Sequence, residues 1–274
     1  MINKKYLKNL RCKEINNKND FIFDLYSERI VDSLDLVSIN FKNILLLGNY
    51  SSKIIKYIKK RYKYSQLTIV DYKKFFNNNF DFIFLSKKCN DLDLLKLDID
   101  KYDLIISNFF LTFSNNLNDC FRKILLSLKS NGFLVATLPG IKNFDSLKSA
   151  MIKTDLQFYD GAYNRFVKGV DLQEIIEILK KNNYKIPSVN AEKIDLEYKQ
   201  FFTLLHDVRS MKLSYFYKDK KNTFEKKMYF KQLEKNFTKN FNNNFELTSN
   251  FYIISGWKEH KSQQKPLKPG EVKN

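Results

Sequence analysis

Five short apolar runs in the first half of the chain constrain its fold more than any other feature of the sequence. They are NILLLG (43–48), QLTIVD (66–71), FDFIFL (80–85), YDLIIS (102–107) and FLVATLP (133–139). Short apolar runs separated by connections or helical segments are typical of parallel strands buried on both faces. A further run, FYIISGW (251–257), predicts a strand that joins the sheet late in the sequence. The sequence therefore predicts an α/β fold, with a mostly parallel sheet and helices on both faces.

Helical periodicity appears between these runs and dominates the second half of the chain. Residues 19–38 place Phe23, Tyr26, Ile30 and Leu34 at steps of three or four, which predicts one apolar helix face. Further helices are predicted at 117–129, with Gly132 placed to end it, and at 171–184, 198–211 and 223–241. We divide the chain into an N-terminal helical segment (1–40), a Rossmann-like domain (41–257) with a helical insertion at about 198–241, and a polar tail (258–274).

The formal net charge of +18 raises the question of a nucleic-acid partner. Only six of the 48 basic residues are arginines, however, and arginine is the better residue for bidentate phosphate and base contacts. The abundance of Lys, Asn, Phe, Tyr and Ile is the bias that an A+T-rich genome imposes. We therefore expect no nucleic-acid partner, and retain the basic stretch 212–239 as a candidate surface for an acidic partner.

Cysteine usage and hydropathy favour a cytoplasmic protein. Cys12, Cys89 and Cys120 lie far apart and form no CxxC or Cys/His cluster, so the sequence predicts neither a disulfide framework nor a metal site. No apolar run approaches the roughly 18 residues that a membrane-spanning helix needs. The N-terminus lacks the apolar core of a signal peptide.

Polar residues at the ends of the predicted strands suggest an adenosine-binding site. Asp71, at the end of the second run, is placed to accept hydrogen bonds from two ribose hydroxyls, and Asp91 is placed to meet the amine of adenine. Gly48 allows close approach of backbone to a ligand, and Asn108 follows the fourth run. Each has a simpler interpretation, since an aspartate at a strand end is often a cap or a turn residue.

Two groups of motifs carry a resemblance to a known superfamily. The first is TIVD together with YDLIISNFFLTFSNNLNDCFRKILLSLKSNGFLVATLPG, and the second is LHDVRSM (205–211) with ISGWKEHKSQQKPLKPG (254–270). They resemble class I S-adenosylmethionine-dependent methyltransferases, and within them malonyl-carrier-protein methyltransferases and relatives of mitochondrial complex I assembly factor 5, an arginine hydroxylase. The resemblance implies a Rossmann-like seven-stranded sheet, S-adenosyl-L-methionine as cofactor, and a complex I subunit or a carrier protein as partner.

The same resemblance assigns site residues by position. The cofactor-binding residues that it implies are Gly48, Asn49, Asp71, Tyr72, Asp91, Leu92 and Asn108, and the weak catalytic candidates are Arg165, His206 and Arg209. His206 is equally a helix residue with a local hydrogen bond, and Arg209 could simply pair with Asp207. The first motif of the family resembles LDLGCGxG, whereas this chain has LLLGNYSS, with Leu46 in place of the acid.

Three functional hypotheses follow from these observations. The first is a methyltransferase or hydroxylase that uses S-adenosylmethionine, with a role in respiratory complex I assembly as the resemblance implies. The altered first motif favours the second, a non-catalytic assembly factor that retains the fold. The third, an RNA methyltransferase, is favoured by the net charge alone. The resemblance implies a bacterial cytoplasmic location, peripheral to the inner membrane during complex assembly.

Overall fold

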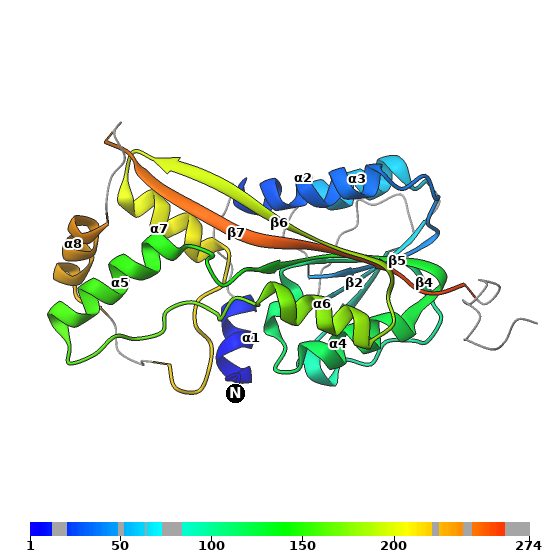
Figure 1. Ribbon diagram of the computed structural model, residues 1–274, viewed down its shortest axis with the longest axis horizontal. Coiled ribbons are helices and arrows are strands. Elements are labelled where there is room, and N and C mark those ends of the chain that lie inside the picture. The colour runs from blue at the N-terminus through cyan, green and yellow to red at the C-terminus, as the bar shows by residue number, and fades with distance from the viewer. Residues whose placement is uncertain are drawn as a thin grey trace, which may run out of the picture.

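A seven-stranded sheet forms the centre of the computed structural model, which describes residues 1–12, 21–48, 52–63, 65–72, 84–220, 225–237 and 243–260. The strand order is β3-β2-β1-β4-β5-β7-β6 (Figure 1). The strands are β1 (Asn43–Leu47), β2 (Gln66–Asp71), β3 (Phe84–Lys88), β4 (Tyr102–Asn108), β5 (Leu128–Pro139), β6 (Lys185–Tyr198) and β7 (Phe245–Trp257). The predicted α/β Rossmann-like sheet is confirmed.

The strand pairing places a topological switch point between β1 and β4. β1 pairs in parallel with β2 on one side and with β4 on the other, so that Leu46 lies opposite both Ile69 and Ile106. β7 runs antiparallel between β5 and β6, which confirms the late-joining strand. In open α/β sheets, ligands bind beyond the carboxyl ends of the strands at such a switch point.

Helices cover both faces of the sheet and extend beyond one end of it (Figure 1). They are α1 (Lys4–Cys12), α2 (Phe21–Asp35), α3 (Ser52–Arg61), α4 (Leu117–Ser127), α5 (Asp145–Phe158), α6 (Leu172–Lys181), α7 (Phe201–Ser210) and α8 (Lys227–Asn236). Helices α2 and α3 lie on one face, α4 and α6 on the other, and α5, α7 and α8 gather beside the end of the sheet where β6 ends and β7 begins. In the part of the chain that is described, no helix has the length and hydropathy to cross a membrane.

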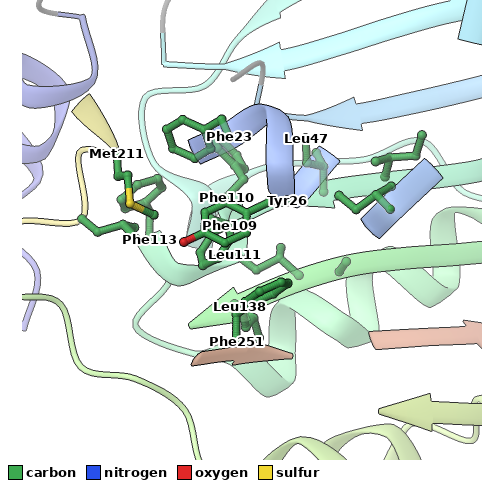
Figure 2. Close-up of a cluster of buried hydrophobic side chains, with 14 of the residues drawn as sticks. Phe23, Tyr26, Leu47, Phe109, Phe110, Leu111, Phe113, Leu138, Met211 and Phe251 are labelled. Atoms are coloured by element: carbon green, nitrogen blue, oxygen red, sulfur yellow. The ribbon is translucent and has the colours of Figure 1, made fainter. Parts of the chain in front are cut away.

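Helix α2 confirms the predicted apolar face, because Phe23, Tyr26, Ile30 and Leu34 are all buried. Figure 2 shows Phe23 and Tyr26 within an aromatic cluster that also contains Phe109 and Phe251. The ring centroids of Tyr26 and Phe109 are 4.6 Å apart, and those of Tyr26 and Phe251 are 4.7 Å apart. The cluster fixes α2 against the carboxyl ends of the strands.

Several boundaries differ from the sequence-based expectation. Helix α4 ends at Ser127, and Gly132 lies inside β5, where an added Cβ atom would be 2.8 Å from the carbonyl oxygen of Lys129. That glycine is required by close packing rather than by a helix end. Neither β6 nor α5 was predicted from the sequence. The alternation of apolar residues in β6 is weak, because β6 is an edge strand that is largely exposed on one side. Residues 80–83 of the third predicted strand lie outside the described residues.

Candidate cofactor site and adjoining cavity

The carboxyl ends of β1 and β2 bring Gly48 and Asp71 to the same edge of the sheet. Gly48 has a φ of 76°, a conformation that favours glycine, and its amide donates to the carbonyl of Val70 at 2.8 Å. The chain turns at Gly48, directly after β1, and the predicted cofactor loop begins there. Asn49, Tyr50 and Ser51, which continue that loop, lie outside the described residues.

Asp71 is held by a cation from the N-terminal helix. Its carboxylate is 2% exposed, and the Nη2 atom of Arg11 lies 2.9 Å from Oδ1 and 2.8 Å from Oδ2. The backbone amide of Tyr72 donates to Oδ1 at 2.6 Å. The Arg11 side chain is itself buried, with its guanidinium 5.3 Å from the centre of the Phe113 ring. The predicted ribose acceptor therefore forms a buried ion pair within the chain.

Asp91 is held by a second cation of α1, in an ion pair whose lysine is exposed. The ammonium group of Lys4 donates to Oδ2 of Asp91, and this hydrogen bond is the main reason why the pKa of Lys4 is raised. Oδ1 of Asp91 caps the short 3-10 helix η1 (Leu92–Leu94) through the amide of Asp93 at 3.2 Å. Lys4 and Arg11 are two helical turns apart, roughly 10 Å, on one face of α1. One helix face thus reaches both acids that were predicted to hold the cofactor.

Helix α1 is anchored at both ends. The amide of Ile2 donates to Oδ1 of Asn115 at 2.9 Å, and the amide of Asn3 donates to the carbonyl of Phe216 at 2.8 Å. At the other end, Nζ of Lys212 donates to the carbonyl of Arg11 at 3.0 Å. Leu7 is 1% exposed between these anchors. The helix is docked by apolar burial as well as by its two cations.

A small apolar cavity lies close to Asp91, whose neighbour Leu92 forms part of its wall. Its walls are Leu47, Leu92, Leu95, Leu97, Leu111, Cys120, Lys123 and Ile124. Branched apolar side chains beside an acid suit the flat face and the amine of a purine. The cavity volume is about 10 Å³, however, which is room for about one water molecule. The chemical character of these residues fits an adenine ring, but the space for one must be created by movement.

Asn108 and Tyr72 turn into the protein. The amide nitrogen of Asn108 donates to Oγ of Ser27 at 3.3 Å, and its oxygen accepts from Oγ1 of Thr137 at 2.8 Å. Tyr72 is 2% exposed and packs against Phe110. Asn108 thus supports the turn at Phe109, whose φ of 55° is rare for a bulky residue. Such backbone strain clusters at functional sites.

A much larger cavity of about 620 Å³ lies among α1, α5, α7 and α8. The lining includes Arg165 and Arg209, two of the three catalytic candidates, and also Tyr6 from α1. The third, His206, is 58% exposed, and its Nδ1 lies 3.4 Å from Oδ1 of Asp207. This geometry matches the simpler interpretation of His206 as a helix residue with a local contact.

The two arginines of this cavity have different surroundings. Nη2 of Arg165 forms ion pairs with Asp155, whose side chain is fully buried, and with Glu225 at 2.8 Å. Its guanidinium also stacks over Tyr229, 4.7 Å from the ring centre. Arg209 stacks over Phe230 at 5.5 Å and meets no acid, Asp207 included, within the described ranges. Arg165 therefore organises the cavity, whereas Arg209 presents its charge to it.

Buried thiols near the predicted site provide a first test of the structure. Burial raises the pKa of Cys89 to about 12 and that of Cys120 to about 11, from an ordinary 9.0. At pH 8 we expect iodoacetamide to modify Cys12 first and to spare the other two until urea is added, as read by peptide mass spectrometry. The unfolded chain releases these thiol protons above pH 9, so the unfolding free energy should fall as the pH rises from about 9 to 12. Equal alkylation rates at all three cysteines in the folded protein would contradict this arrangement.

Sequence reasoning missed the residues that contact the predicted acids. Arg11 and Lys4 lie 60 and 87 residues from their partners, and nothing near them in the sequence marks the pairing. Their spacing of seven within a predicted helical segment was the available signal, because it places both cations on one face. Asp155 and Glu225, which hold Arg165, carried no comparable signal.

Similarity to known proteins agrees with the geometry. No protein-family model matches the chain. It is 31% identical over 177 residues to mitochondrial arginine-hydroxylase NDUFAF5 of Dictyostelium discoideum, covering 62% of this chain and 40% of that protein. It is 25% identical over 229 residues to malonyl-[acyl-carrier protein] O-methyltransferase of Acetivibrio thermocellus, covering 77% and 78%. The chain thus spans less than two thirds of the Dictyostelium protein.

Solved structures share the fold at low sequence identity. The YcgJ protein of Bacillus subtilis superposes with a TM-score of 0.55 and 12% identity, covering 85% of this chain and 99% of that one. Phosphoethanolamine N-methyltransferase 2 of Haemonchus contortus gives 0.53 and 12%, covering 95% and 61%. The sheet topology and the curated relatives together confirm the resemblance of this chain to the class I S-adenosylmethionine-dependent methyltransferase superfamily.

Proposed function

We propose that this chain is an S-adenosylmethionine-dependent methyltransferase-like enzyme that acts on a protein or on a carrier-protein-bound group. The observation that carries the proposal is the position of Asp71 at the carboxyl end of β2 and of Asp91 after the end of β3, on the β1 side of the switch point between β1 and β4. The cavity of about 620 Å³ beside α1 would bind the methyl acceptor.

Five residues would hold the cofactor. Asp71 would accept hydrogen bonds from the ribose hydroxyls, and Asp91 would accept one from the adenine amine. Leu47 and Leu92 would pack against the base, and Gly48 would allow close backbone approach. The cofactor itself supplies an electrophilic methyl group, so the protein mainly has to hold donor and acceptor close and aligned.

Before the cofactor can bind, α1 must move so that Lys4 and Arg11 no longer contact the two acids. When only a small fraction of the protein is in the conformation that binds a ligand, the apparent affinity for that ligand falls in proportion to the fraction. Ribose hydroxyls would then replace the guanidinium at Asp71, which keeps that buried carboxylate hydrogen-bonded. In this exchange, the two acids would serve the cofactor when it is bound and the cations of α1 when it is absent.

The names of two curated relatives support the proposed acceptor class. One is named for O-methylation of a malonyl carrier protein, and another for hydroxylation of arginine. Both names point to protein-borne acceptors rather than RNA. A role in respiratory complex I assembly is the finer proposal, supported by similarity to NDUFAF5 over 62% of this chain in the Dictyostelium case.

A non-catalytic assembly factor is the second candidate. The buried Arg11–Asp71 pair favours it, because this pair neutralises the acid that a nucleoside cofactor needs. In that case α1 is a permanent part of the fold, and the methyltransferase topology serves as a scaffold for a protein partner.

Incubation of the purified chain with methyl-labelled S-adenosylmethionine separates these candidates. The acceptors are malonyl carrier protein and an arginine-bearing complex I subunit, and the intact mass of each distinguishes an added methyl group from an added oxygen. We expect one of the two to be modified. Binding of S-adenosylhomocysteine without modification of either would overturn the acceptor class, and absence of binding up to millimolar concentration would overturn the enzyme.

A further inference from the structure

The cavity of about 620 Å³ is a built pocket with an apolar body and a cationic rim. Met151 of α5, Leu205 and Val208 of α7, and Tyr229 and Phe230 of α8 supply the apolar and aromatic surface. Arg209 is exposed and Tyr163 is 39% exposed, so the pocket reaches solvent. Its volume falls within the range of roughly 300–1,000 Å³ that is typical of small-molecule sites.

A buried network gives this pocket a fixed wall. Asp155 is fully buried, accepts from the hydroxyl of Tyr229 at 2.8 Å and from the amide of Tyr163 at 3.0 Å, and forms an ion pair with Arg165. Glu225 pairs with Arg165 and accepts from the hydroxyl of Tyr159. The charge of Arg165 is therefore more than offset by two carboxylates, and this wall of the pocket is organised before any ligand arrives.

Two further cations on the lining are not balanced in this way. Arg209 lies over the ring of Phe230, and Nζ of Lys220 lies 3.7 Å from the centre of the Tyr6 ring. Neither forms an ion pair with an acid of the described residues. Asp219, beside Lys220, is engaged by the hydroxyl of Tyr215 at 2.8 and 2.9 Å. The pocket thus presents two cations stacked on aromatic rings, above an apolar interior.

We propose that this cavity binds an acceptor that ends in a carboxylate carried on an apolar chain, with Arg209 and Lys220 as its anion-binding residues. A guanidinium fork matches the two oxygens of a carboxylate, and the exposed Arg209 is accessible to one. A cationic acceptor such as an arginine side chain would meet like charge here. The assignment to an acceptor rests on the proposed function, but anion binding by the pocket does not.

Titration calorimetry with hexanoate, hexanol and hexylamine tests the charge preference on the full chain without cofactor. These probes share a six-carbon chain and differ in charge. We expect hexanoate to bind more tightly than hexanol, and hexylamine to bind least. Arg209→Gln should weaken hexanoate binding at least about tenfold, because a charge-assisted hydrogen bond is lost, and Lys220→Gln should weaken it by a smaller factor.

Arg122→Gln is the matched control, because it removes one exposed arginine that pairs with Asp119 on α4, outside the cavity. Its hexanoate affinity should equal that of the unaltered protein. Equal binding of hexanoate and hexylamine, or hexanoate binding unchanged in Arg209→Gln with the fold retained, would overturn the inference. A chain that binds hexanoate but not S-adenosylhomocysteine would retain the anion site and lose the methyltransferase function.

Discussion

Replacing Asp71 with asparagine is expected to weaken S-adenosylhomocysteine binding at least about 100-fold, because two charge-assisted hydrogen bonds to ribose, each about 1.5–3 kcal/mol, are lost. The same change should lower the free energy of unfolding by about 3–5 kcal/mol, since Arg11 stays buried without its carboxylate partner. Calorimetric titration gives the first quantity, and urea unfolding followed by circular dichroism gives the second.

Two further variants separate binding from stability. Asp32→Asn removes an exposed acid of α2 that pairs with Arg29 at 3.6 Å, and it should leave both measurements unchanged. In the double variant Arg11→Met with Asp71→Asn, no buried charge remains at this site. Its unfolding free energy should therefore recover most of the loss, while cofactor binding stays weak. Unimpaired binding in folded Asp71→Asn would remove Asp71 from the cofactor site.

Replacing Arg11 with methionine is expected to have the opposite effect on binding. Methionine keeps apolar contact with Phe113 but no longer competes for Asp71, so the apparent affinity for S-adenosylhomocysteine should rise at least about tenfold. The free protein should lose about 3–5 kcal/mol of unfolding free energy, because Asp71 is left in a buried position without this cation. Titration well below the unfolding temperature measures the affinity.

Lys5→Met is the control for this experiment, because Lys5 is an exposed residue of the same helix and pairs with no acid of the described chain. It should change neither affinity nor stability. Hydrogen exchange of residues 4–12 in the unaltered protein adds an independent measurement, and it should speed up when ligand is added. Unchanged or weaker binding in folded Arg11→Met would mean that α1 does not compete with the cofactor, and would favour the non-catalytic assembly factor.

The helices and strands were largely predictable because each carries its signal in neighbouring residues. A helix was predicted from residue 171, and the side chain of Asp171 accepts from the amide of Gln173 at the start of α6. The face of α2 followed from a period of three to four residues. The edge strand β6 was not predicted because half of it faces solvent, and the sequence of an exposed, largely polar strand resembles that of a loop.

The candidate site was only half predictable for a related reason. Sequence order placed Asp71 and Asp91 at strand ends, but it contained no information about what contacts them. Asn108 was expected among the cofactor-binding residues, and its side-chain amide bonds Ser27 and Thr137 in the interior. The direction of a side chain at a strand end depends on which neighbours pack there, and those neighbours come from α2 and β5.

The sequence by itself determined the α/β sheet, the positions of the two acids and the superfamily resemblance, because apolar periodicity and motif spacing are local properties. The tertiary structure decided which cations meet those acids and which residues surround the large cavity. Arg11 meets Asp71 across 60 residues, and Tyr6, Arg165, Arg209 and Tyr229 converge from four separate segments. Such contacts depend on how whole elements pack, and packing is set by the global burial of apolar surface rather than by any local pattern.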